Sequence, residues 1–152
     1  CGTPPIHHIF GLDEALRMFE EEGGIRAVTN RHRRLATAVR AAVHAWSSTG
    51  AVEFNAINEH ERSDSVTCVR VGPEHDADQV IEVARDKYNL TMGRGIGPLA
   101  GSAFRIGHLG DLNVPMVLGA LGAIEASLRT CRIPVGSGGL EAAADELSDV
   151  SG

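Results

Sequence analysis

The apolar residues of segment 25–47 recur at helical spacing over an unusually long stretch. The stripe that they form contains Val28, His32, Leu35, Val39, Val43 and Trp46. A helix of about 22 residues is about 33 Å long, which is nearly the diameter of a small domain. Part of this apolar face is therefore long enough to cover a neighbouring unit.

The segment before this helix has a simpler pattern. Pro4 and Pro5 predict an extended start to the chain. Apolar residues at helical spacing between positions 12 and 19 predict a first helix, which ends at the glycine pair that begins with Gly23.

The middle of the chain changes to the two-residue period of β-strands. Residues 66–71 (VTCVRV) alternate and are rich in β-branched side chains, so they predict a strand. Two more strands are predicted, a short one around residues 90–92 and another at residues 103–107. Asp76 and Asn113 are suited to cap two further helices. This order of elements predicts an α/β (α+β) fold in which a small, mostly antiparallel sheet has helices packed on one face.

The composition changes after Pro134. Residues 136–139 (GSGG) are typical of a linker, and residues 140–147 predict a short, peripheral acidic helix. We therefore expect residues 132–152 to form a flexible tail that contains a short helix.

Composition argues against several classes of protein. The 152 residues suit one domain, and the net charge of -6 argues against a nucleic-acid partner. No apolar run approaches the roughly 18 residues of a membrane-spanning helix. Cys1, Cys68 and Cys131 are odd in number and widely spaced, which predicts free thiols and a cytoplasmic location. A start at cysteine rather than methionine is typical of a piece of a longer protein.

Arg105 is the principal candidate for a binding residue. Because side chains alternate along a strand, Arg105 shares its face with Ala103 and Gly107, the two small residues that flank it. A guanidinium in such a place needs an anionic partner, and its planar fork fits a carboxylate or a phosphate. The partner is either an Asp or Glu of the same chain or the acid group of a ligand. The residues alone favour the internal ion pair, because structural ion pairs outnumber ligand sites.

Other motifs that carry chemistry are weak. The glycine-rich segment 93–97 leads into a strand instead of a helix, so it predicts a wide hairpin or a mobile loop rather than a phosphate site. Lys87, the sole lysine, lies in a polar stretch and is expected to be a solvated surface residue. The histidines lack partners at metal-ligand spacing, and we predict no metal site. His7 and His8 would face opposite ways on an extended segment, while His32 is expected to be a hydrogen-bonded packing residue.

Two runs together resemble the C-terminal domain of class V (fold type I) pyridoxal-phosphate aminotransferases, above all the alanine–glyoxylate and serine–glyoxylate type. They are residues 92–101 (MGRGIGPLAG) and 104–113 (FRIGHLGDLN). Supporting runs are residues 3–6 (TPPI), 11–16 (GLDEAL) and 32–36 (HRRLA). The likeness covers the chain from about Thr3 to Arg129 in unbroken order.

The resemblance implies roles for two residues of this chain. The arginine that matches Arg105 binds the α-carboxylate of the amino-acid or 2-oxo-acid substrate in this family. The threonine that matches Thr3 contacts the phosphate of the cofactor, pyridoxal 5'-phosphate, across a homodimer interface. These enzymes also need a lysine to hold the cofactor, and Lys87 matches no such position.

The resemblance also implies a division of the chain. Residues 1–24 would contact a large domain that this chain lacks, and residues 25–131 would form the small domain, beginning with the interdomain helix. The parent protein would transfer an amino group from alanine or serine to glyoxylate or another 2-oxo acid, without nucleic acid or membrane as partner. The chain alone would contain no catalytic residue and would be inactive. The alternative is a stand-alone, non-catalytic α/β module that binds a small carboxylate or serves in dimerisation.

Overall fold

The computed structural model describes residues 2–148, and these fall into two compact units that meet between Arg31 and His32. The first unit contains helix α1 (Ile6–Glu22) and the first turns of helix α2 (Gly24–Trp46). Helix α1 ends at Gly23, whose φ of 111° places it in the left-handed region that glycine tolerates best. No residue of α1 is buried.

The extended start is shorter than the sequence predicts. Helix α1 begins directly after Pro5, so His7 and His8 lie in its first turn. The expectation that these two histidines occupy an extended segment is therefore wrong. Proline is well tolerated just before or within the first turn of a helix, where its missing N–H has no intrahelical partner.

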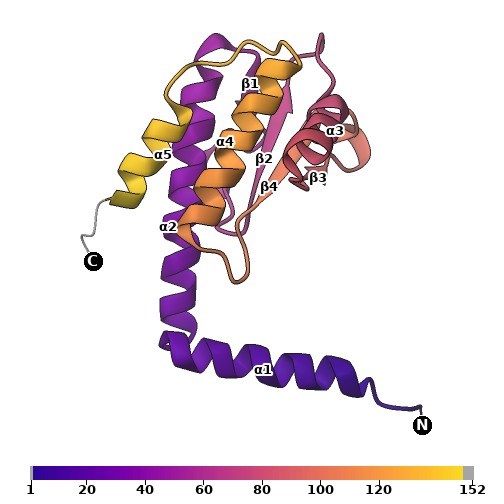
Figure 1. Ribbon diagram of the computed structural model, residues 1–152, viewed down its shortest axis with the longest axis vertical. Coiled ribbons are helices and arrows are strands. Elements are labelled where there is room, and N and C mark those ends of the chain that lie inside the picture. The colour runs from indigo at the N-terminus through magenta and orange to yellow at the C-terminus, as the bar shows by residue number, and fades with distance from the viewer. Residues whose placement is uncertain (1, 149–152) are drawn as a thin grey trace. The chain divides into compact units, whose positions relative to one another are not determined.

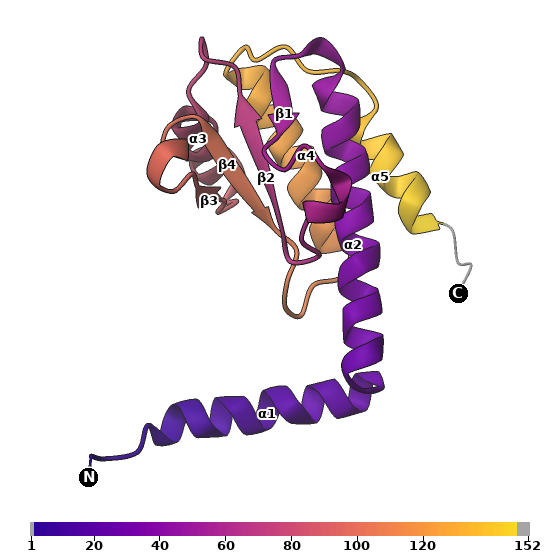
Figure 2. The ribbon, with the colours of Figure 1, turned by 180° about the vertical axis from the view of Figure 1, so that it is seen from behind.

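The second unit is built on a four-stranded antiparallel sheet with the order β1-β2-β4-β3. Its strands are β1 (Val52–Phe54), β2 (Val66–Val71), β3 (Gly93–Arg94) and β4 (Ala103–Gly107). Helices α2, α3 (Ala77–Tyr88) and α4 (Val114–Thr130) lie on one side of this sheet, as the views from the two sides show (Figures 1 and 2). The predicted mixed α/β fold, with an antiparallel sheet and helices on one face, is confirmed.

The long helix buries its predicted stripe. From His32 onward the stripe residues of α2 are buried, and Val43 and Trp46 are fully enclosed. The caps are also as predicted, since Asp76 accepts a hydrogen bond from the amide of Asp78, and Asn113 accepts one from the amide of Met116.

Two strands differ from the predicted pattern. Strand β1 has only three residues and was not predicted, because so short a run carries no clear alternation. The short strand expected at residues 90–92 is found immediately afterwards, as β3. The position of β3 is determined by its pairing with β4 rather than by the local strand propensity of its residues.

The segment after Pro134 contains helix α5 (Gly139–Ser148), where the sequence predicts a short helix within residues 132–152. Ala143 and Leu147 of this helix are buried in the same core as α2 and α4. Helix α5 is therefore part of the packing of the second unit and is not peripheral.

Candidate functional site

Strand β4 turns Arg105 away from the helices. Phe104 and Ile106 point into the core and are 0% and 5% exposed, so the alternation of the strand directs Arg105 to the opposite face. Arg105 is half-buried there, between Cys68 of β2 and Gly93 of β3, its partners in the ladder. Among the described residues of the second unit, no α-helix covers this face of the sheet (Figure 2).

The guanidinium of Arg105 is hydrogen-bonded to the protein backbone. Its Nε donates a hydrogen bond of 2.9 Å to the carbonyl oxygen of Arg94. Within residues 2–148 no carboxylate forms an ion pair with Arg105. Of the two partners that the sequence allows, the internal Asp or Glu is therefore not found in the described part of the chain.

Two neighbouring arginines have carboxylate partners. Arg70, on the same face as Arg105, pairs with Glu53 across β1 and β2 at 3.3 Å. Arg94 pairs with Asp78 of α3 at 2.7 Å. The positive charge of Arg105 is thus the one on this face that is left for an anion, among the residues that the structure describes. A carboxylate would suit its fork.

Cys68 faces Arg105 across the ladder. Burial raises the pKa of the Cys68 thiol above its ordinary value, while the nearby charges of Arg105 and Arg70 oppose that rise. The thiol is therefore largely protonated at neutral pH and presents a small, neutral surface beside the guanidinium. Sequence reasoning did not single out Cys68 as a neighbour of Arg105, because the register of β2 against β4 is a tertiary feature.

The glycine-rich segment is a wide hairpin between β3 and β4, as predicted. A short 3-10 turn, Gly97–Leu99, lies at its tip, and the amide of Gly95 donates to the carbonyl of Ala103 at 2.9 Å. A side chain at Gly95 would place its Cβ 1.9 Å from the carbonyl oxygen of Leu99, so only glycine fits there.

Thr3 and Lys87 are both exposed. Thr3 is exposed in the short segment before α1 and belongs to the first compact unit, whereas Arg105 belongs to the second. Lys87, the sole lysine of the chain, is exposed in the last turn of α3, as predicted. The residues of this chain therefore do not fit pyridoxal phosphate by themselves.

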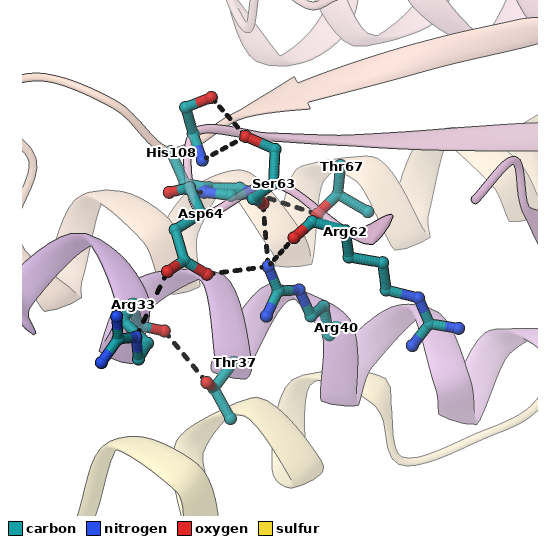
Figure 3. A network of polar contacts seen from close by, with 9 residues as sticks. Arg33, Thr37, Arg40, Arg62, Ser63, Asp64, Thr67 and His108 are labelled. Atoms are coloured by element: carbon teal, nitrogen blue, oxygen red, sulfur yellow. Dashed lines mark hydrogen bonds and ion pairs between the residues drawn. The ribbon is translucent and has the colours of Figure 1, made fainter. Parts of the chain in front are cut away.

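A buried polar network supports the end of β4, and sequence reasoning missed it. His108 is fully buried; its Nδ1 lies 2.9 Å from the carbonyl oxygen of Asp64, and its Nε2 lies 3.0 Å from the hydroxyl of Thr67 (Figure 3). Since a carbonyl can only accept, Nδ1 carries the hydrogen and Nε2 accepts from Thr67. The Asp64 carboxylate pairs in turn with Arg40 at 2.9 Å and with Arg33 at 3.3 Å.

This network is structural in character. It joins β2, the β1–β2 connection and the segment after β4 to α2, and His32 on α2 accepts a hydrogen bond from the amide of Gly110. His32 is thus the packing residue that the sequence predicts. Among the described residues, no group of three His, Cys, Asp or Glu side chains is arranged to hold a metal ion.

A hollow of about 420 Å³ lies elsewhere in the second unit, and Arg105 is not among its lining residues. Its lining comes from α2, the β1–β2 connection and α5, and includes Arg40, His44, Glu59, Arg62 and Glu146. Arg62 already pairs with Glu59 at 3.3 Å, and Arg40 with Asp64. Its guanidinium groups therefore have carboxylate partners, whereas that of Arg105 has none within residues 2–148.

Comparisons with known proteins bear on the same region. The family model described as Aminotransferase class-V matches residues 1–102. The serine–glyoxylate aminotransferase of Arabidopsis thaliana is 39% identical over 142 residues, which are 93% of this chain and 34% of that protein. The serine–glyoxylate aminotransferase of Methylorubrum extorquens is 40% identical over 148 residues, which are 97% of this chain and 36% of that protein.

Solved structures agree with these sequences. Pyridoxamine–pyruvate aminotransferase from Mesorhizobium loti superimposes with a TM-score of 0.86 and 31% identity, covering 96% of this chain and 36% of that one. Ureidoglycine–glyoxylate aminotransferase from Bacillus subtilis superimposes with a TM-score of 0.80 and 27% identity, covering 90% of this chain and 34% of that one. The chain thus spans about a third of the length of these relatives. No helix of its described residues has the length and apolar character needed to cross a bilayer.

Proposed function

The chain belongs to the class-V aminotransferase family, of the serine/alanine–glyoxylate type, and from this premise we propose that it forms the C-terminal, substrate-binding part of a glyoxylate aminotransferase. The observation that carries the proposal is the guanidinium of Arg105, which forms no ion pair within residues 2–148 and lies on the open face of the sheet. In the whole protein this group binds the α-carboxylate of the substrate.

The proposed reaction moves an amino group from a small amino acid, alanine or serine, to glyoxylate or another 2-oxo acid. Every donor and acceptor of this kind carries a carboxylate beside the reacting carbon, so one arginine serves both halves of the reaction. Arg105 contributes orientation, because a bidentate pair restricts how the substrate lies, and it takes no part in proton transfer.

The cofactor and the lysine that holds it come from outside this chain. The cofactor, pyridoxal 5'-phosphate, supplies the electron sink of amino-group transfer, and a lysine of the rest of the protein holds it. Thr3 adds a hydroxyl to the phosphate site of a homodimer, and residues 1–24 contact the large domain. This chain alone is inactive, and a cytoplasmic location agrees with its free Cys68 and Cys131 thiols.

The names of the relatives support this substrate class. They include aminotransferases that act on serine, on L-aspartate and on alanine with glyoxylate, and one that acts on pyridoxamine with pyruvate. Glyoxylate and pyruvate are both 2-oxo acids, whereas the amino donors differ.

The experiment is a substitution in the complete protein that contains this chain. We expect Arg105→Ala to raise KM for both substrates and to lower turnover, because the carboxylate loses two charge-assisted hydrogen bonds. The loss should be roughly 2–4 kcal/mol, or tens to several hundredfold in kcat/KM. Arg70→Ala is the matched control, since Arg70 lies on the same face but already pairs with Glu53. Unchanged kinetics in the Arg105 variant would remove this residue from the site.

A second candidate function rests on the same guanidinium, which has no carboxylate partner among the described residues. A non-catalytic module could bind a small carboxylate through Arg105 without any cofactor. Calorimetry of the 152-residue chain with glyoxylate, alanine and serine separates the two. Saturable binding without pyridoxal phosphate favours the binding module. If no saturable binding is measured under these conditions, the proposed function is favoured.

A further inference from the structure

We propose that the backbone of β3 positions the Arg105 guanidinium, with the carbonyl of Arg94 as its anchor and Gly93 as its cradle. The inference rests on the proposed function, in which Arg105 binds the substrate carboxylate. It adds how the guanidinium of Arg105 is oriented and which neighbouring residue must remain small.

The anchor is the hydrogen bond from Nε. An arginine side chain has five N–H donors, one on Nε and four on the two terminal nitrogens. Nε of Arg105 donates to the Arg94 carbonyl at 2.9 Å, and within residues 2–148 the terminal nitrogens have no hydrogen-bond partner. A carboxylate must therefore approach Nη1 and Nη2 together, end-on, rather than Nε and one terminal nitrogen from the side.

The cradle is the space left by the missing side chain of Gly93. Gly93 pairs with Arg105 in the ladder. A Cβ at Gly93 would lie 3.1 Å from Nε and 3.3 Å from Cζ of Arg105, which is closer than such atoms normally pack. The guanidinium thus lies over the backbone of Gly93, and a larger residue there would force it to shift by a few tenths of an ångström.

The backbone carbonyl of Arg94 accepts the hydrogen bond from Arg105, whereas its side chain forms ion pairs with α3. It pairs with Asp78 and Glu82 of α3, at 2.7 and 3.5 Å, and remains about half exposed. Exposed pairs of this kind contribute little to stability. The carbonyl is held chiefly by the β3–β4 ladder, so removing the Arg94 side chain should leave the anchor in place.

This difference supplies a matched pair of variants. Gly93→Ala should displace the guanidinium, whereas Arg94→Ala changes the adjacent residue and keeps both the carbonyl and the cradle. The first measurement uses the 152-residue chain labelled with 15N at arginine Nε, with the Arg105 signal assigned by its disappearance in Arg105→Lys. We expect hydrogen exchange at the Arg105 Nε to be about tenfold faster in Gly93→Ala, because a hydrogen bond of about 1.4 kcal/mol is lost, and unchanged in Arg94→Ala.

The second measurement is KM for glyoxylate in the complete protein. We expect Gly93→Ala to raise KM several-fold and Arg94→Ala to leave it within about twofold. Unchanged Nε exchange in Gly93→Ala overturns the inference, as does equal loss of protection in both variants, which would implicate the strand instead of the cradle. Loss of protection without a rise in KM overturns the role in carboxylate binding.

The Arg105→Ala variant separates this inference from the proposed function. If Arg105→Ala raises KM but Gly93→Ala changes neither exchange nor KM, only the positioning role fails. If Arg105→Ala leaves KM unchanged, the proposed function fails, whatever the exchange at Nε shows.

Discussion

Individual side chains of the sheet differ in whether their charge is already compensated. Arg70 and Arg105 lie on the same face, but Glu53 neutralises the first and no described carboxylate reaches the second. The difference follows from strand order, because β1 supplies Glu53 opposite Arg70 whereas β3 offers Arg105 only a carbonyl and a glycine. An arginine whose neighbours are backbone groups keeps its charge available for a ligand.

The buried imidazole of His108 predicts a dependence of stability on pH. Burial lowers the pKa of His108 below that of an exposed histidine, partly offset by its hydrogen bond to Asp64. The unfolded chain therefore binds more protons than the folded chain once the pH falls below about 6.5, and stability decreases as pH falls through this window. The decrease attributable to His108 is at most about 1.4 kcal/mol per pH unit.

Urea unfolding at about pH 7.5 and about pH 5.5 measures this decrease. His108→Gln removes the titrating ring, so the fall in unfolding free energy between the two conditions should be smaller than in the unsubstituted chain. His60→Gln changes an exposed histidine and should retain the full decrease. An equal decrease in all three proteins would show that His108 does not titrate in this window.

At the scale of elements, helix α5 is held by close contact with α2. Gly139 begins α5, and Trp46 of α2 is fully buried beside it. The indole N–H of Trp46 donates to the carboxylate of Glu125 on α4 at 2.9 Å, so one side chain joins three helices. Close approach of these helices requires the small residue at position 139.

Gly139→Ala should therefore destabilise the second unit. The added Cβ would lie 2.1 Å from Nε1 of Trp46, and the enclosed indole has no room to move away. We expect a loss of about 1–3 kcal/mol, measured by urea unfolding with the fluorescence of the sole tryptophan as the signal.

The matched control lies on α4, facing the same helix. A Cβ at Gly122 would meet Leu140 at 3.9 Å, an ordinary contact, so Gly122→Ala should stabilise the chain by about 0.5–1 kcal/mol through the helix preference of alanine. Similar losses in both variants would contradict the steric explanation.

At the scale of the whole molecule, apolar surface is concentrated on α1. The sequence predicts that part of the apolar face of the long helix covers a neighbouring unit, yet its stripe is buried from His32 onward. The large exposed apolar residues of the first unit lie mainly on α1. They are Ile6, Ile9, Phe10, Leu12, Leu16, Met18 and Phe19, with exposed fractions of 36–67%. Such a surface is typical of an interface.

The chain on its own should therefore self-associate through α1. The double variant Leu12→Glu/Leu16→Glu places two charges among these apolar residues and should weaken association at least tenfold, since each buried leucine contributes about 1.5–3 kcal/mol. Ile57→Glu is the control, because Ile57 is 83% exposed but lies outside α1. Sedimentation velocity measures the association, and a monomeric chain at high concentration would contradict the prediction.

Local patterns were enough to determine much of this protein. The stripe of α2, the caps Asp76 and Asn113, the strands β2 and β4 and the hairpin at residues 93–97 follow from spacing and from residue chemistry, which neighbouring residues alone decide. The prediction that Arg105 needs an anion is of the same kind, and the runs around it carried the resemblance to the aminotransferase family.

Tertiary structure decided that the charge of Arg105, and not that of Arg70, is left available for an anion. Strand order assigns Glu53 to Arg70, register brings Cys68 and Gly93 beside Arg105, and the fold buries His108 and α5. Pairing across a sheet joins residues that lie far apart in the chain. A shift of one residue in register would exchange the two faces, so no local pattern could have specified these neighbours.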